Sequence, residues 1–172
     1  MRHNGRTRFV FLTAFAIWAL DFLTKTWAVA SLSSSPREII GTLLQFTLVR
    51  NPGAAFSFAT GFTLIFTTIA VSVFIFITRY AHRFTSQGWA LVAGLVLGGV
   101  SGNLTDRIFR EPGFLYGHVI DWIELPHWPI FNCADSAIVI AAFIAFYLTL
   151  RGVPPIAGTS NPMSNTNGET SE

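Results

Sequence analysis

Four long apolar stretches dominate the chain, and each is close to the length that a helix needs to cross a membrane. They run over about 9–30, 62–80, 89–106 and 132–150. A transmembrane helix needs about 20 mainly apolar residues to span the hydrocarbon core. The pattern therefore predicts an all-α membrane protein with four transmembrane helices, in which residues 1–151 form a single domain.

The loop between the first two spans carries a strand signal. In the segment LLQFTLVRN, Leu44, Phe46 and Leu48 share one side of the chain, and polar residues alternate with them. Such alternation is typical of a half-buried strand, and the turn sequence NPG follows it at 51–53. We expect a small extracytoplasmic β-sheet at the membrane surface.

Composition and charge support a membrane protein and set its orientation. Hydrophobic residues make up 51% of the chain and charged residues 12%, against about 25% charged residues in soluble proteins. Basic residues gather before the first span, between the second and third, and after the fourth: Arg2, Arg6, Arg8, Arg79, Arg83 and Arg151. The positive-inside rule then places both termini in the cytoplasm and the loops 31–61 and 107–131 outside. No continuous basic stripe exists, so we expect no nucleic-acid partner.

The two ends of the chain need separate interpretation. The start, MRHNGRTR, resembles the basic region of a cleaved signal peptide, with AVA at 28–30 as a cleavage site. Asp21 and Lys25 interrupt that segment, which favours a retained first span. Residues 152–172 are rich in Pro, Ser, Thr, Asn and Gly, and we expect them to form a disordered cytoplasmic tail.

Charged side chains at membrane depth are costly and need an explanation. Asp21 and Lys25 are four residues apart, in the favourable order for an ion pair on a helix. They form either a neutralised structural pair, with Lys25 reaching outward to the interface, or part of a functional site.

A stripe of glycines in the third span leads to another acid. Gly94, Gly98 and Gly102 recur at steps of four, a spacing that lets helices approach closely, and Asp106 is the next position on the same face. Asp106 either marks a polar helix end or joins a polar cluster that fixes this span against its neighbours, and we favour the cluster.

Two further acids lie near the outer end of the spans. Asp121 is embedded between Ile120 and Trp122, which is unusual for a free loop. Asn132 and Asp135 stand at the start of the fourth span in the spacing of a capping box, so Asp135 has a structural explanation. The same helix dipole would also favour the ionised form of a catalytic carboxylate.

These groups suggest chemistry at the outer membrane face. Two close carboxylates can share a proton, so that one activates water and the other protonates a carbonyl. A zinc site built on His118 and His127 is a weaker alternative. A small proton-coupled transporter or channel, or a subunit that only packs, are the other classes. We expect no metal and no organic cofactor.

Five ordered blocks resemble bacterial lipoprotein signal peptidase (signal peptidase II), a family of intramembrane aspartic endopeptidases. They are DFLTK from position 21, NPGAAFS from 51, GGVSGNLTDR from 98, GHVIDWI from 117 and FNCADSAI from 131. The blocks cover nearly the whole chain. Cys133 stands where the family more often has an aliphatic residue, and the linker between the last two blocks is short.

The resemblance implies a function and a set of site residues. It implies cleavage of diacylglyceryl-modified prolipoproteins before the lipidated cysteine, in the bacterial inner membrane, with membrane lipid as a partner and the cyclic peptide globomycin as an inhibitor. The catalytic pair maps to Asp121 and Asp135. The residues expected to support the site or the substrate are Asp21, Lys25, Asn51, Gly53, Asn103, Asp106, Arg107, Asn132 and Ala134.

Overall fold

The structure is a computed structural model, which describes residues 2–53 and 61–156. The long helices are α1 (Arg2–Ser31), α2 (Gly61–Tyr80), α3 (Gln87–Phe109) and α4 (Cys133–Leu150). A short 3-10 helix, η1 (Ala81–Arg83), follows α2, and the strands are β1 (Arg37–Ile40), β2 (Leu44–Asn51) and β3 (Val119–Glu124). All four long helices are long and apolar enough to cross a membrane, which agrees with the predicted fold class.

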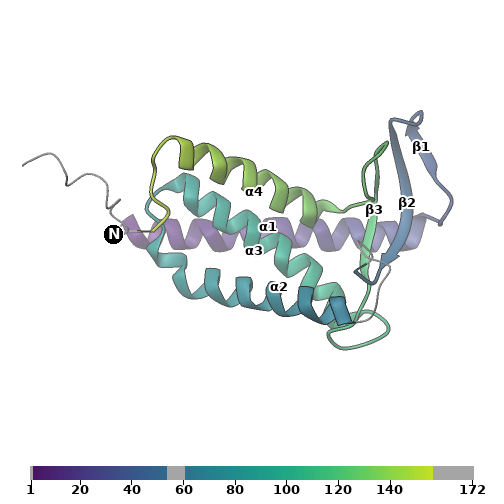
Figure 1. The fold of residues 1–172 in the computed structure, drawn as a ribbon, viewed down its shortest axis with the longest axis horizontal. Coiled ribbons are helices and arrows are strands. Elements are labelled where there is room, and N and C mark those ends of the chain that lie inside the picture. The colour runs from purple at the N-terminus through teal and green to yellow at the C-terminus, as the bar shows by residue number, and fades with distance from the viewer. Residues whose placement is uncertain (1, 54–60, 157–172) are drawn as a thin grey trace, which may run out of the picture.

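Helix α3 is the centre of the bundle. It packs against α1, α4 and α2, and more than half of its apolar span is buried, whereas α2 and α4 turn most of their side chains outward. The sheet lies at one end of the bundle, and the start of α1 and the end of α4 lie at the other end (Figure 1). The segments that follow α1 and α3 therefore lie at the same end of the bundle.

Glycines allow α3 to approach two helices closely. A Cβ atom on Gly98 would lie 2.7 Å from the carbonyl oxygen of Ala14 in α1, and one on Gly99 would lie 2.6 Å from that of Ala134 in α4. Both distances are too short for real atoms, so larger residues would push these helices apart. The predicted glycine packing face on α3 is confirmed, and it holds α1 and α4 on two sides of α3.

The three strands form an antiparallel sheet in the order β1-β2-β3, with Val49 paired to Asp121. Aromatic rings fix this sheet on α1. The ring of Trp122 lies 5.4 Å from that of Trp27 and 5.0 Å from that of Phe46, both edge to face. Edge-to-face contacts of buried rings add to the free energy of burial. The strand predicted between the first two spans is confirmed, and β3 is its partner.

Two predicted boundaries differ from the structure. Helix α1 begins at Arg2 rather than near residue 9, and at about 1.5 Å per residue its 30 residues extend about 45 Å, beyond a hydrocarbon core of about 30 Å. Residues 152–156, the start of the expected disordered tail, are ordered. The indole of Trp89 donates a hydrogen bond of 2.9 Å to the carbonyl of Val153, and Thr85 N–H donates to Pro155. Residues 157–172 lie outside the described part of the chain.

Candidate active site

A buried lysine organises the polar groups at the sheet end of the bundle. Lys25 Nζ lies 2.7 Å from Asp21 Oδ2 and 2.9 Å from Asp106 Oδ2, and it donates to Asn103 Oδ1 at 2.9 Å. Lys25 is 1% exposed, so of the two alternatives left open by the sequence, the one in which Lys25 reaches outward to the interface is wrong. The ammonium has three protons and three partners, so two carboxylates and an amide oxygen replace the water that burial removes.

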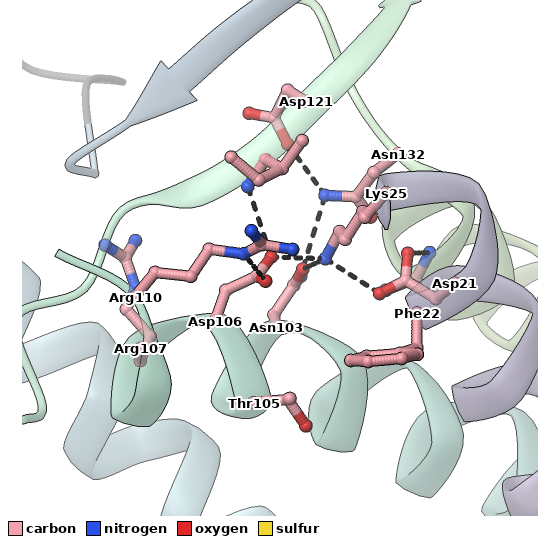
Figure 2. Close-up of polar contacts among 12 residues, drawn as sticks. Asp21, Phe22, Lys25, Asn103, Thr105, Asp106, Arg107, Arg110, Asp121 and Asn132 are labelled. Carbon is pink, nitrogen blue, oxygen red and sulfur yellow. Dashed lines mark hydrogen bonds and ion pairs between the residues drawn. The ribbon is translucent and has the colours of Figure 1, made fainter. Parts of the chain in front are cut away.

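Asp106 connects this charge cluster to the sheet. Its Oδ2 accepts a 3.1 Å hydrogen bond from the backbone N–H of Ile120, the residue before Asp121, and its Oδ1 pairs with Arg110 Nε. Figure 2 shows Asp106 between Lys25 and this strand. Helix α3 continues three residues beyond Asp106, so the polar cluster, rather than a helix end, explains this acid.

Arg107 holds the loops around the site instead of pairing with Asp106. Its Nη1 donates to the carbonyl oxygens of Gly117 at 2.9 Å and Asn51 at 3.3 Å. These carbonyls belong to the segment before β3 and the end of β2. The side chain therefore fixes the two strands that carry Asn51 and Asp121 relative to α3.

The turn after β2 is built by Asn51 and Gly53. The N–H of Gly53 donates to Asn51 Oδ1 at 2.8 Å, and Gly53 has a φ of 108°, which favours glycine. Because Oδ1 is used in the turn, the Nδ2 group of Asn51 is directed at Asp121 Oδ2, at 2.8 Å. The turn thus orients a hydrogen-bond donor toward one of the expected catalytic acids.

Asp135 is held at the start of α4 by a complete capping box. Asn132 Oδ1 accepts from the N–H of Asp135 at 3.0 Å, and Asp135 Oδ2 accepts from the N–H of Asn132 at 3.2 Å. Asn103 Nδ2 donates to Asp135 Oδ1 at 2.8 Å. Both carboxylate oxygens therefore accept N–H hydrogen bonds at the N-terminus of α4.

Asn132 also connects the two expected catalytic residues. Its Nδ2 donates to Asp121 Oδ1 at 2.7 Å and lies 3.2 Å from Asn103 Oδ1. Asp121 is 2% exposed and Asn132 is fully buried. Figure 2 shows the Asn132 amide between Asp121 and Asn103. One side chain therefore caps α4 and positions Asp121.

The environment of Asp121 makes its carboxyl easier to protonate than an ordinary aspartate. Burial, with a smaller contribution from the charge of Asp135, raises the pKa of the Asp121 carboxyl from the ordinary 3.8 to about 6, although the hydrogen bonds from Asn51 and Asn132 act in the opposite direction. The two acids thus have different surroundings, one desolvated and one at a helix N-terminus. Such a difference assigns acid and base roles in pairs of carboxylates.

The first turn of α4 is anchored to α1. The N–H of Ala134 donates to Asp21 Oδ1 at 2.9 Å, and both residues are fully buried. Ala134 contributes through its backbone, which explains why its side chain gives no chemical signal in the sequence. Asp21 therefore belongs to the buried charge cluster and also fixes the first turn of α4, which carries Asp135.

Every residue expected at the site lies in this region, and one contributor was missed. Arg110 pairs with Asp106 one helical turn earlier, a spacing of four residues that the sequence does contain. The two histidines proposed as an alternative zinc site do not fulfil that role. Within residues 2–53 and 61–156, no group of three His, Cys, Asp or Glu side chains is placed to hold a metal ion.

The chain is similar to known proteins over most of its length. Residues 13–151 match the family model for signal peptidase (SPase) II. It is 48% identical over 153 residues to the lipoprotein signal peptidase of Rhodococcus jostii, covering 88% of this chain and 77% of that one. The corresponding protein of Streptomyces coelicolor is 47% identical over 157 residues, with 90% and 77% covered.

Solved structures share the fold. A structure described as a bacterial membrane enzyme, obtained by the in meso method at 1.9 Å resolution, superimposes with a TM-score of 0.72 at 26% identity. The match covers 83% of this chain and 92% of that one. The arrangement of four helices with a small sheet at one end therefore recurs in a bacterial membrane enzyme.

Proposed function

The chain belongs to the signal peptidase II family, and from this premise we propose that Asp121 and Asp135 form its catalytic dyad. As a member of this family it is an aspartic endopeptidase that removes signal peptides from prolipoproteins. The observation that carries the dyad is the position of Asn132, which donates to Asp121 and forms the capping box with Asp135. Because the chain belongs to this family, we set aside the alternative function of a proton-coupled transporter.

The surroundings of the two acids support different roles at the start of the reaction. Asp135, with N–H donors on both oxygens, is the ionised base that removes a proton from water. The resulting hydroxide attacks the carbonyl carbon of the scissile peptide bond. Asp121, whose pKa is raised to about 6, is the acid that gives its proton to the carbonyl oxygen. A tetrahedral diol is formed, and Asp135 then holds the proton taken from water.

Cleavage of the carbon–nitrogen bond reverses these roles. Asp135 gives its proton to the leaving nitrogen, and Asp121 takes a proton back from the diol as the carbonyl reforms. The products are a free carboxylic acid and a free amine, and the dyad returns to its starting state. In this proposed cycle the two carboxylates carry a single shared proton.

We assign the substrate as a prolipoprotein with a diacylglyceryl-modified cysteine, cleaved on the N-terminal side of that cysteine. Asn51 and the turn at Gly53 lie at the end of β2 next to Asp121, where an extended peptide would meet the dyad. The lipid chains would remain in the bilayer beside the outward-facing helices. Globomycin, a cyclic peptide, would occupy the same position and block cleavage.

The proposed location is the bacterial cytoplasmic membrane, with both termini inside and the site at the outer face. The sequence places basic residues at the start of α1, around η1 and after α4, and these segments lie together at the end opposite the sheet (Figure 1). Positive charge retained on the cytoplasmic side supports this orientation. A fused alkaline phosphatase should be active after residue 34 and inactive after residue 156, and the reverse pattern would contradict the orientation.

The dyad is tested with two variants and a matched control. Purified Asp121→Asn and Asp135→Asn should each lose prolipoprotein cleavage by at least about 10³-fold, because either change removes an acid–base group. Glu124→Gln removes a carboxylate from the same strand as Asp121 and should keep near-normal cleavage. Thermal unfolding of each variant checks that it is folded. Near-normal cleavage by a folded variant of either aspartate would refute the dyad.

A further inference from the structure

A surface hollow lies near the outer end of α3 and is lined by none of the expected site residues. Its volume is about 820 Å³. Its lining comes from the end of β2, the end of α3 and the segment that leads to β3: Arg50, Phe109, Arg110, Glu111, Pro112 and His118. Arg50 is next to Asn51 in the chain, so the hollow borders the site.

The hollow contains two guanidinium groups that are not fully paired with carboxylates of the protein. Within residues 2–53 and 61–156, Arg50 forms no ion pair with a carboxylate, and Arg110 uses only its Nε on Asp106. The terminal nitrogens of a guanidinium form a planar pair of donors that fits phosphate oxygens. Glu111 places one negative charge at the same rim, so binding of an anion there depends on the arginines.

The position of the hollow matches the boundary between hydrocarbon and headgroups. It begins where the apolar span of α3 ends, and exposed aromatic residues occur in its lining, at Phe109, and in the loop that follows α3. Phe109 is 80% exposed, Phe114 69% and Tyr116 43%. Exposed aromatic residues next to arginines at the end of a membrane span are typical of the membrane interface.

We propose that this hollow binds the phosphodiester headgroup of an anionic phospholipid, in the leaflet at the sheet end of the bundle. The guanidinium groups of Arg50 and Arg110 contact the phosphate oxygens, and the acyl chains extend past Phe109 and along α3 into the hydrocarbon core. The lipid would lie beside the turn of Asn51, where a lipid-modified substrate reaches the site. The inference depends on the proposed orientation only in one respect: the orientation identifies the leaflet at the sheet end as the outer one.

Native mass spectrometry of the full-length protein in a neutral detergent tests the proposal. The probes are phosphatidylglycerol and phosphatidylcholine with identical acyl chains, and glycerol 3-phosphate as a soluble competitor. We expect one phosphatidylglycerol to bind at least fivefold more tightly than phosphatidylcholine, and Arg50→Gln to weaken it by about fivefold, the usual effect of one arginine on anionic lipid. Arg37→Gln, which removes an exposed charge from β1, should change the affinity by less than twofold.

A second variant, with the opposite expected effect on lipid binding, tests the proposal even if Arg50→Gln does not fold. Glu111→Gln removes the negative charge at the rim and should strengthen phosphatidylglycerol binding, and thermal unfolding confirms that each variant is folded. Unchanged binding in a folded Arg50→Gln, equal losses in Arg50→Gln and Arg37→Gln, or no gain in Glu111→Gln would overturn the site. Complete displacement of the lipid by an equal concentration of glycerol 3-phosphate would overturn the assignment to lipid.

Discussion

The side-chain amide of Asn132 donates a 2.7 Å hydrogen bond to Asp121 Oδ1, and the same side chain caps α4, the helix whose first turn carries Asp135. Asn132→Ala should therefore lower kcat by at least about 10²-fold, because a small misplacement of catalytic groups has that effect. It should also lower stability by about 1 kcal/mol through the lost cap. Steady-state cleavage of a prolipoprotein and thermal unfolding measure the two effects.

The control for this prediction is another helix cap. Ser86 caps α3 by accepting from the N–H of Trp89, at the end of the bundle away from the dyad. Ser86→Ala should cost a similar amount of stability and keep near-normal kcat. Equal losses of kcat in both variants would mean that Asn132 acts only through helix stability.

The raised pKa of Asp121 predicts the pH dependence of cleavage. A general acid must be protonated, so kcat/KM should fall as the pH rises through about 6. The bond from Asn51 favours the ionised carboxylate, so Asn51→Ala should raise the pKa and move this fall to higher pH. Profiles of kcat/KM against pH measure both. Gln45→Ala, on the same strand, is the control, and a fall that moves to lower pH in Asn51→Ala would contradict the assignment.

Removal of Lys25 should destabilise the protein more than removal of an exposed cation. Lys25→Met leaves Asp21 and Asp106 buried without their shared ammonium, and breaking a buried ion pair costs about 3–5 kcal/mol. Asp21→Asn combined with Lys25→Met should lose less than the sum of the two single losses. Denaturant unfolding measures this, with Arg151→Gln as the exposed control. Additive losses would show that the charges do not interact.

The close contact between α3 and α1 predicts a difference between two glycines. Gly98→Ala places a methyl group against the backbone oxygen of Ala14 and should cost about 1–3 kcal/mol. A methyl group on Gly88 meets only the flexible end of Leu148, so Gly88→Ala should be nearly neutral. Thermal unfolding compares the two variants. Similar melting temperatures would contradict the role of Gly98 in helix packing.

Patterns within one segment predicted much of this structure. The apolar spans, the strand before Asn51, the glycine face of α3 and the cap of Asp135 by Asn132 are all encoded by residues close together in the chain. Their physical causes are local: hydrophobic period, turn chemistry and helix-end hydrogen bonds.

The choice of long-range partners was less predictable. Lys25 points into the protein because Asp106, from another helix, adds a second carboxylate to that of Asp21. Arg107 contacts backbone carbonyls while Arg110 pairs with Asp106, although both arginines are close enough to Asp106 in the sequence to be its partner. Such choices depend on the rotation of packed helices, which the pattern of a single helix does not determine.

The capping box of α4 links catalysis to the synthesis of the chain. Asn132 and Asp135 are translated after α1, α3 and β3, so a nascent chain that ends before them carries Asp121 without the amide of Asn132 and without the second acid. Proteolytic competence is then acquired only when the last helix inserts and docks on α1 and α3. A partly inserted protein would therefore not cleave the unprocessed precursors in the same membrane.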